Sequence, residues 1–217
     1  MKTLGIHHEG WKFFALFFIT SIVFYFIATP IAYLMFGLSL FTLYFFRDPD
    51  RITPDQANAI ISPADGKICQ IKTIEAPDEV GLPADQKCLK VSIFMNVFNV
   101  HVNRSPMSGE VIHDQYIKGR FFNASFDKAS EHNERHALRI ATQNGQEIGM
   151  VQIAGLIARR IIQWIPDTNQ LRCGQRFGLI RFGSRVDLYL PTDTFINVTL
   201  GQKVKAGETM IGQLEQQ

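Results

Sequence analysis

Residues 13–46 read FFALFFITSIVFYFIATPIAYLMFGLSLFTLYFF, a run of 34 residues without a single Asp, Glu, Lys, Arg or His. The run holds 10 of the 18 phenylalanines of the chain. A signal peptide has an apolar core of about 7 to 15 residues followed by a small-residue cleavage site, and this run continues well past that length. It also lacks the polar face that a helix packed on a soluble core would show. The run therefore predicts a membrane-attachment segment over residues 1–46.

Pro30 divides the run into two arms, Phe13–Thr29 and Ile31–Phe46. At about 1.5 Å per residue each arm is about 25 Å long, slightly less than the roughly 30 Å of a bilayer core. Both a hairpin that dips in and returns and a single long kinked span therefore remain open.

The charges that flank the run favour the hairpin. Lys2 and Lys12 precede it, and Arg47 and Arg51 follow it. Basic flanks tend to stay in the cytoplasm, so both ends of the run are drawn to the same side. We expect an N-terminal hydrophobic helical hairpin at the cell membrane, with residues 47–217 on its cytoplasmic face.

The overall charge and the cysteines exclude several classes of protein. The 217 residues carry 22 basic and 20 acidic groups, for a formal net charge of +2. This balance disfavours a nucleic-acid partner, which would need a broad cationic surface. The 46% apolar content excludes a disordered chain. Three cysteines without a C-x-x-C pair predict reduced thiols rather than a disulfide framework or a zinc ribbon.

Residues 47–217 show a β-type pattern. Short apolar runs of about five or six residues alternate with Gly and Pro, which is typical of a mostly antiparallel sheet, sandwich or barrel. The expected strands are 67–74, 88–94, 97–102, 110–113, 138–142, 148–154, 157–164, 177–181, 185–190 and 194–199.

Two short similarities refine this fold class. Residues 62–68 (SPADGKI) and 105–111 (SPMSGEV) share the pattern S-P-x-x-G-x-[IV], a turn that feeds a strand. Residues 198–212 resemble the half-motif of lipoyl and biotinyl carrier domains, whose strands form a barrel-sandwich hybrid. They lack an M-K-M-like lysine, so this similarity concerns fold and not function. We therefore expect a mainly β, barrel-sandwich-hybrid-like catalytic domain with lipoyl-like half-motifs.

Three positions could carry chemistry, although each also has an ordinary structural reading. Gly183-Ser184 is the only Gly-Ser dipeptide and reads as a turn, but in a strained turn the glycine carbonyl is open to attack by the next hydroxyl. His101 shares the polar face of a strand with Asn103 and could accept a proton near neutral pH. Asp65 precedes Gly66 and reads by default as a turn residue.

Two further pairs are weaker candidates. His132 and His136 have i, i+4 spacing, which could bind a metal only on a helix, and no third ligand is evident, so no metal site is predicted. Arg159 and Arg160 could contact phosphate or anionic lipid headgroups, or form a solvated pair.

Five motifs, taken in order, resemble the short bacterial and archaeal form of phosphatidylserine decarboxylase. The resemblance runs from residue 45 to the C-terminus, and five ordered motifs are far more specific than any one. The motifs are FFRDPDR at 45–51, SPADG at 62–66, FNVHVNRSP at 98–106, ARRI at 158–161 and RFGS at 181–184.

The resemblance implies a proenzyme that cuts itself between Gly183 and Ser184, leaving a β chain of residues 1–183 and an α chain of residues 184–217. Ser184 would become a pyruvoyl group, the cofactor, whose ketone forms a Schiff base with the serine amine of phosphatidylserine. Loss of carbon dioxide would then give phosphatidylethanolamine.

The resemblance also implies a triad in which His101 is the base and Asp65 orients it and stabilises its charged form. His101 would be a proton donor in the decarboxylation as well. Longer family members carry a second histidine three positions earlier, where this chain has Phe98. The implied partners are the lipid in its membrane and the two chains of one precursor, and a homo-oligomer is left open.

The alternative reading is a membrane-anchored, lipoyl-like adaptor without catalysis. Such adaptors usually insert a long helical hairpin between the lipoyl halves, and this sequence shows none. An adaptor would remain one chain, whereas the enzyme would yield two.

Overall fold

The computed structural model describes residues 2–83, 85–119, 133–142, 145–155 and 160–215. The chain divides into two units, Met1–Asp50 with Phe98–Val100, and Arg51–Val97 with His101–Gln217. Each unit is described by itself.

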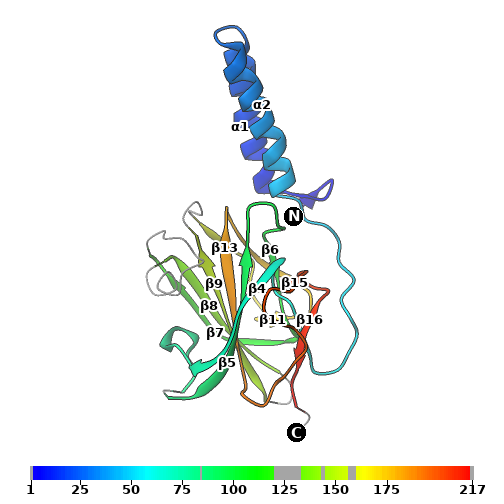
Figure 1. The fold of residues 1–217 in the computed structure, drawn as a ribbon, viewed down its shortest axis with the longest axis vertical. Helices are drawn as coiled ribbons and strands as arrows, with labels where there is room; N and C mark the ends of the chain where they lie inside the picture. The colour runs from blue at the N-terminus through cyan, green and yellow to red at the C-terminus, as the bar shows by residue number, and fades with distance from the viewer. Residues whose placement is uncertain (1, 84, 120–132, 143–144, 156–159, 216–217) are drawn as a thin grey trace. The chain divides into compact units, whose positions relative to one another are not determined.

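The first unit is a pair of helices. Helices α1 (His8–Tyr25) and α2 (Thr29–Phe45) lie side by side and run in opposite directions (Figure 1). A small ribbon of β1 (Lys2–Thr3) and β2 (Ile6–His7) precedes them. The two arms predicted from the apolar run are therefore both helical. Pro30 lies in the first turn of α2, where its missing N–H breaks no helical hydrogen bond.

Helix α1 begins five residues before the apolar run and takes in two charged residues. The carboxylate of Glu9 accepts a hydrogen bond from Lys12 Nζ at 2.7 Å. The ring Nδ1 of His7 accepts a hydrogen bond from the Glu9 N–H at 3.4 Å, which caps the helix. Burial, followed by the charges of His8 and the N-terminus, lowers the pKa of His7 to about 4.

Most of the helix surface is apolar and exposed. Phe26 and Ile27, in the turn between the helices, are 82% and 73% exposed, and Leu16, Ile19, Ile22, Val23, Tyr33 and Leu34 are at least half exposed. In the part of the chain that the structure describes, no helix reaches the length and apolar character required to cross a membrane.

Residues 98–100 belong to the helical unit through a contact with the end of α2. The Phe98 carbonyl oxygen accepts hydrogen bonds from Arg47 Nη2 at 2.6 Å and from Tyr44 Oη at 3.2 Å. The Arg47 guanidinium also stacks 4.0 Å from the centre of the Tyr44 ring. Two donors on one carbonyl hold this short segment against the helix.

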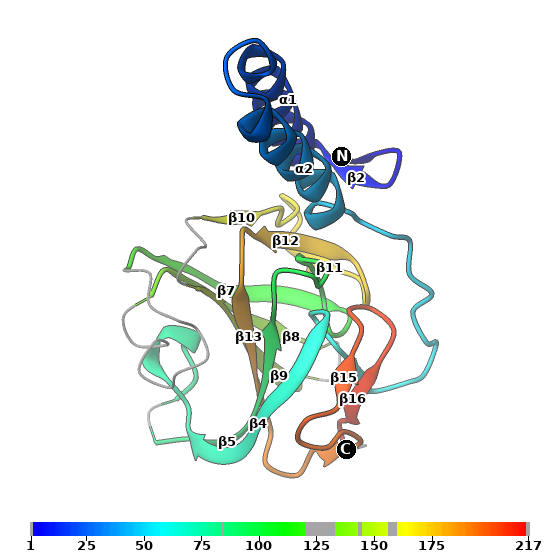
Figure 2. The same cartoon turned by 45° about the horizontal axis from the view of Figure 1, so that its top comes forward.

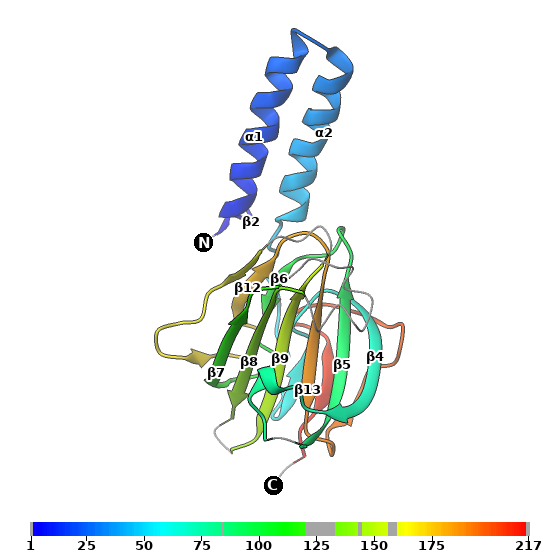
Figure 3. The same ribbon diagram turned by 90° about the vertical axis from the view of Figure 1, so that its left-hand side faces the viewer.

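The second unit is built on an antiparallel sheet. Within the described residues, eight strands follow the order β11-β7-β8-β9-β13-β5-β4-β15. Figure 3 shows the run from β7 to β4 side by side in one curled sheet. Their bounds are β4 (Gly66–Glu75), β5 (Lys87–Met95), β7 (Gly109–Ile117), β8 (Arg135–Ala141), β9 (Glu147–Ala154), β11 (Gln170–Leu171), β13 (Ser184–Leu190) and β15 (Lys203–Val204).

Two smaller sheets complete the unit. One has the order β10-β12-β6 and the other β14-β16-β3, and all of their strand pairs are antiparallel. A short 3-10 helix, η1 (Asp78–Val80), precedes β5. The remaining strands are β3 (Ala59–Ile61), β6 (Val102–Arg104), β10 (Ile161–Gln163), β12 (Arg176–Ile180), β14 (Phe195–Ile196) and β16 (Met210–Gln213).

The mainly β, antiparallel class predicted from sequence is confirmed. The C-terminal segment returns to the first turn-strand repeat, because β15 pairs with β4 and β16 pairs with β3 (Figure 2). The finer prediction of lipoyl-like half-motifs stays a prediction.

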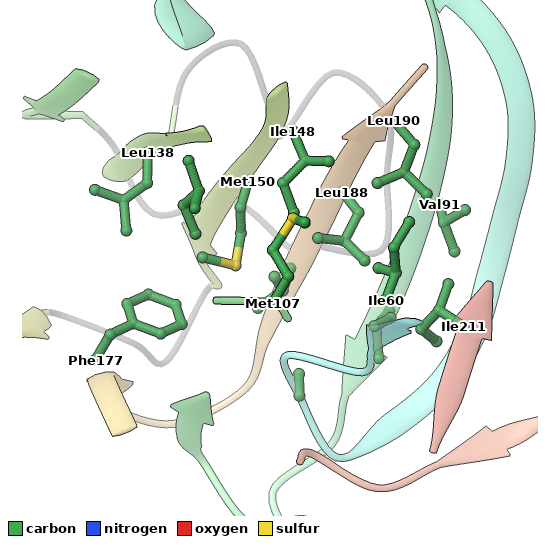
Figure 4. Close-up of a cluster of buried hydrophobic side chains, with 14 of the residues drawn as sticks. Ile60, Val91, Met107, Leu138, Ile148, Met150, Phe177, Leu188, Leu190 and Ile211 are labelled. Atoms are coloured by element: carbon green, nitrogen blue, oxygen red, sulfur yellow. The ribbon is translucent and has the colours of Figure 1, made fainter. Parts of the chain in front are cut away.

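The core lies on the inner face of the large sheet. Along β13, Val186, Leu188 and Leu190 point to this face, as the two-residue period of a strand requires, and Tyr189 points to the other. Phe177 of β12 and Ile211 of β16 close the inner core from the smaller sheets (Figure 4). Since apolar side chains cover both faces, all seven residues of β13 are buried.

Candidate active site

The Gly183-Ser184 bond lies in a tight turn between β12 and β13. Phe182 and Gly183 have φ values of 58° and 67°, so two consecutive residues are in the left-handed region. For a side chain such as Phe this conformation costs about 1 to 2 kcal/mol. A Cβ at Gly183 would meet no atom within 4 Å, so the glycine is favoured by its backbone angle and not by lack of space. The turn places backbone strain directly before Ser184.

Ser184 is the first residue of β13 and lies between Met95 of β5 and Ala154 of β9. Its side chain is fully buried, and its Oγ has no hydrogen-bond partner among the described residues. A buried polar group without a partner costs about 1 to 3 kcal/mol. No hydrogen bond to the described residues therefore fixes the orientation of this hydroxyl.

His101 lies beside this turn, 82 residues earlier in the chain than Gly183. It directly precedes β6, and β6 pairs with β12, the strand that leads into the turn. The ring is fully buried, and its Nε2 accepts a long hydrogen bond of 3.4 Å from the Gly183 N–H. An accepting Nε2 carries a lone pair, which is the form of the imidazole that can act as a base. The structure thus brings together two of the three predicted site positions.

Asp65 lies at the same end of the sheet. It directly precedes β4, whose first residues lie opposite the last residues of β5, and β5 in turn brings Met95 opposite Ser184. Its carboxylate accepts hydrogen bonds from Arg51 Nη2 at 2.9 and 3.1 Å and from the Ala206 N–H at 2.8 Å. These bonds fix the carboxylate between the segment before β3 and the turn after β15.

Arg51 pairs with the candidate residue Asp65, a contact that the sequence did not predict. Its side chain is 8% exposed and pairs with both Asp65 and Glu208, the latter at 3.4 Å. From the sequence, Arg51 is a flanking charge of the apolar run and the last residue of the 45–51 motif, without a predicted role in the site. The signal that could have found it is its place at the end of the 45–51 motif.

Among the described residues, the remaining candidates do not come together in a second site. His136 lies on strand β8 and not on a helix, and His132 lies outside the described residues. Among the residues that are described, no cluster of His, Cys, Asp or Glu could hold a metal ion. Arg160 is exposed, whereas Arg159 is not among the described residues. Cys69, Cys88 and Cys173 all carry free thiols.

Comparison with known proteins places this site in a family. A family model described as phosphatidylserine decarboxylase matches residues 38–212, which include Asp65, His101 and Ser184. The chain belongs to the phosphatidylserine decarboxylase family. It is 46% identical over 210 residues to a phosphatidylserine decarboxylase proenzyme of Ruegeria pomeroyi, covering 97% of this chain and 95% of the relative. It is 52% identical over 174 residues to one of Desulfotalea psychrophila, covering 80% and 79%.

Phosphatidylserine decarboxylases are carboxy-lyases made as proenzymes, and their cofactor is a pyruvoyl group formed from a serine of the chain itself. The residues present here fit such a group. Ser184 offers a buried hydroxyl without a hydrogen-bond partner among the described residues, and two residues with left-handed backbone angles precede it. Ser184 is 0% exposed, so a group formed at this position would be shielded from bulk water.

Proposed function

We propose that this protein is a self-processing, pyruvoyl-dependent decarboxylase that converts phosphatidylserine to phosphatidylethanolamine and carbon dioxide. One observation carries the proposal: the unpartnered Ser184 Oγ follows two left-handed residues, and His101 Nε2 contacts the N–H of Gly183. This arrangement has a nucleophile, a base and a strained bond in one place.

Self-processing begins at these residues. His101 removes the proton of Ser184 Oγ, which attacks the Gly183 carbonyl carbon, so that a C–O bond forms and the C–N bond breaks to give an ester. Loss of the Cα proton of residue 184 then expels the Gly183 carboxylate and leaves a dehydroalanine. Its enamine tautomerises to an imine, and one water hydrolyses the imine with release of ammonia. The products are a β chain that ends at Gly183 and an α chain that begins with the pyruvoyl group.

We propose Asp65 as the residue that supports the charged form of His101. The support for this assignment is its place at the end of β4, beside the strand that pairs with Ser184, and its match to the family motif. A fixed carboxylate favours an imidazolium at short range. Because Arg51 and Ala206 already hold the carboxylate, it needs no rearrangement when the histidine charges.

In the mature enzyme the pyruvoyl group supplies an electron sink for the carboxylate bond of the substrate. The contribution of the chain is to bind the serine headgroup beside position 184, to exclude water and to move a proton. We propose His101 Nε2 as the group that donates this proton, because the ring is buried and contacts Gly183, the last residue of the β chain after cleavage.

We further propose that residues 1–46 attach the protein to the cytoplasmic face of the cell membrane. The support is the exposed apolar surface of α1 and α2, which would be costly in water and is stabilised in lipid. Membrane attachment would give the enzyme access to a substrate whose acyl chains stay in the bilayer. The alternative, a lipoyl-like adaptor, would not need a strained turn beside a buried histidine.

Intact mass and denaturing electrophoresis of the full chain test the proposal. We expect two chains, residues 1–183 and 184–217, the smaller one blocked by a carbonyl group, together with release of carbon dioxide from vesicles that contain phosphatidylserine. Ser184→Ala should give one uncut, inactive chain, and His101→Ala should fail at least to cut. An active preparation that consists of one uncut chain would overturn the proposal. Cleavage of His101→Ala at the normal rate would refute the role of His101 as the base.

A further inference from the structure

A line of buried polar side chains crosses the second unit from its surface to the candidate active site. Asp114 Oδ1 lies 2.8 Å from His136 Nε2, and His136 Nδ1 lies 2.8 Å from Gln152 Oε1. Gln152 Nε2 donates to Asn103 Oδ1 at 2.7 Å, and Asn103 Nδ2 donates to the Pro63 carbonyl oxygen at 3.4 Å. We call this series the polar relay.

The relay is unusual because its inner members are fully enclosed. His136 and Asn103 are 0% exposed and Gln152 is 1% exposed, whereas the side chain of Asp114 is 41% exposed. Gln152 points to the same inner face as Val186, which it directly opposes on the neighbouring strand. A polar group in such a place is costly unless it is hydrogen-bonded, and each inner member has partners on both sides.

The acceptor at the inner end fixes the direction of the relay. The Pro63 carbonyl can only accept, so the amide NH2 of Asn103 must face it and Asn103 Oδ1 must face Gln152. Gln152 therefore donates through Nε2 and accepts through Oε1, which requires His136 Nδ1 to donate. Every amide orientation in the relay follows from that one carbonyl.

The relay ends beside the reacting bond. Asn103 follows His101 by two residues; its side chain contacts Gln152 of β9, and His101, just before β6, contacts the Gly183 N–H before β13. Asn103 Nδ2 lies 3.8 Å from Met95 Sδ, and Met95 is the residue directly opposite Ser184. Asn103 thus connects β6 of the small sheet to β9 and β5 of the large one at the level of Ser184.

We propose that Asn103 is a positioning residue for self-cleavage. Held in one orientation by Gln152 and His136, it fixes the start of β6 against β5 and β9, and so keeps His101 Nε2 at the Gly183-Ser184 junction. The proposal rests on the proposed function. In this proposal the polar relay positions the base His101 for cleavage, in addition to stabilising the core.

Replacement of one donor tests the direction of the relay. Gln152→Glu keeps the size and shape of the side chain, but its carboxylate cannot donate to Asn103 Oδ1. Asn103 Oδ1 must then either face the carboxylate, which is a second acceptor, or the Asn103 amide must turn over and lose its hydrogen bond to the Pro63 carbonyl. We expect self-cleavage at pH 8, followed over time on newly made protein by denaturing electrophoresis, to be about tenfold slower or more, because a buried acceptor loses its donor. Gln115→Glu, an exposed position on β7, is the matched control and should cut at the parent rate.

The pH dependence separates positioning from a purely structural role. Position 152 faces His136 of β8 and Asn103 of β6, with Asp114 of β7 beyond the histidine and His101 just before β6. Once protonated, a glutamic acid at position 152 can again donate to Asn103. The ratio of the cutting rate of Gln152→Glu to that of the parent should therefore rise as the pH falls.

The outcomes are distinguishable. If the parent chain does not cut at all, the proposed function fails, and the positioning role fails with it. If the parent cuts and folded Gln152→Glu cuts at the same rate, or if the ratio of their rates does not change with pH, only the positioning role is overturned. If Gln152→Glu does not fold, Asn103→Ala decides: folded protein that cuts about tenfold more slowly supports the role, and cutting at the parent rate overturns it.

Discussion

At the scale of single residues, the bond proposed for cleavage, Gly183-Ser184, is distinguished by backbone angles as much as by side chains. Ser184 is an ordinary strand residue apart from its unpartnered hydroxyl, and Gly183 meets no steric crowding. What distinguishes the bond is the succession of Phe182 and Gly183 in the left-handed region, with His101 on one side. Such strain persists only where surrounding structure imposes it, and here β12 and β13 do so.

The role of Asp65 can be separated from that of its partner. We expect Asp65→Asn to slow self-cleavage at least about tenfold, because a neutral amide does not stabilise an imidazolium as a carboxylate does. Arg51→Gln leaves the carboxylate and its bond to the Ala206 N–H in place, so its effect should be smaller. The rate at which newly made precursor disappears measures both. Equal losses in the two variants would contradict a direct action of Asp65 on His101 and would favour a role for the Arg51 pair in anchoring the site.

At the scale of elements, strand β13 is buried on all sides, whereas helices α1 and α2 expose apolar side chains. Strand β13 has neighbours on both edges and apolar side chains on both faces, so the backbone of Ser184 is paired on both sides while its hydroxyl has no partner among the described residues. The helices instead expose apolar side chains and, within their own unit, pack on each other, with the end of α2 bonded to residues 98–100. At the start of α1, the helix is capped by a titratable side chain, His7.

Acid should weaken the cap of α1. The pKa of His7 is lowered to about 4, because burial disfavours the charged ring, whereas an unfolded histidine titrates near 6.5. Above pH 6.5 the ring is neutral in both states and the cap is complete. As the pH falls from 6.5 towards 4, protonation favours the uncapped state, and a protonated Nδ1 cannot accept from the Glu9 N–H, a bond of about 1 kcal/mol.

Thermal unfolding in detergent checks this expectation. The parent should lose stability between pH 7.5 and 4.5 relative to His7→Asn, because asparagine caps a helix without titrating in this range. A constant difference between the two proteins across this range would contradict the role of His7 as a pH-sensitive cap.

At the scale of the whole molecule, self-cleavage should not release the α chain. Residues 184–217 contain β13, β14, β15 and β16, and β13 lies between β9 and β5 in the middle of the large sheet. We expect both chains to elute together in native gel filtration after cutting and to separate only in denaturant. Every residue of β13 is buried, so loss of the α chain, which contains β13, would expose the apolar core to water. Recovery of the β chain alone from native buffer would contradict this.

Much of the fold could be predicted from sequence because its signals are local. The uncharged run predicts two arms about Pro30, and α1 and α2 occupy them. Alternation and turn residues predict β5, β9 and β13 to within a residue or two of their ends. The strand predicted at 110–113 is too short, because β7 continues to Ile117 through polar residues that pair with β8. Pairing with a neighbouring strand extended β7 where its own pattern ended.

For the candidate site, too, some features follow from the sequence and others only from the tertiary structure. Sequence alone determined which residues were candidates: Gly183 and Ser184 as a dipeptide, His101 on a polar strand face and Asp65 in a turn, joined by their resemblance to one family. Only the tertiary structure decided that His101 reaches Gly183, that Arg51 holds Asp65 and that the polar relay ends beside Met95. The physical reason is that strand pairing brings together residues tens of positions apart, and local sequence patterns do not encode which strands will be neighbours.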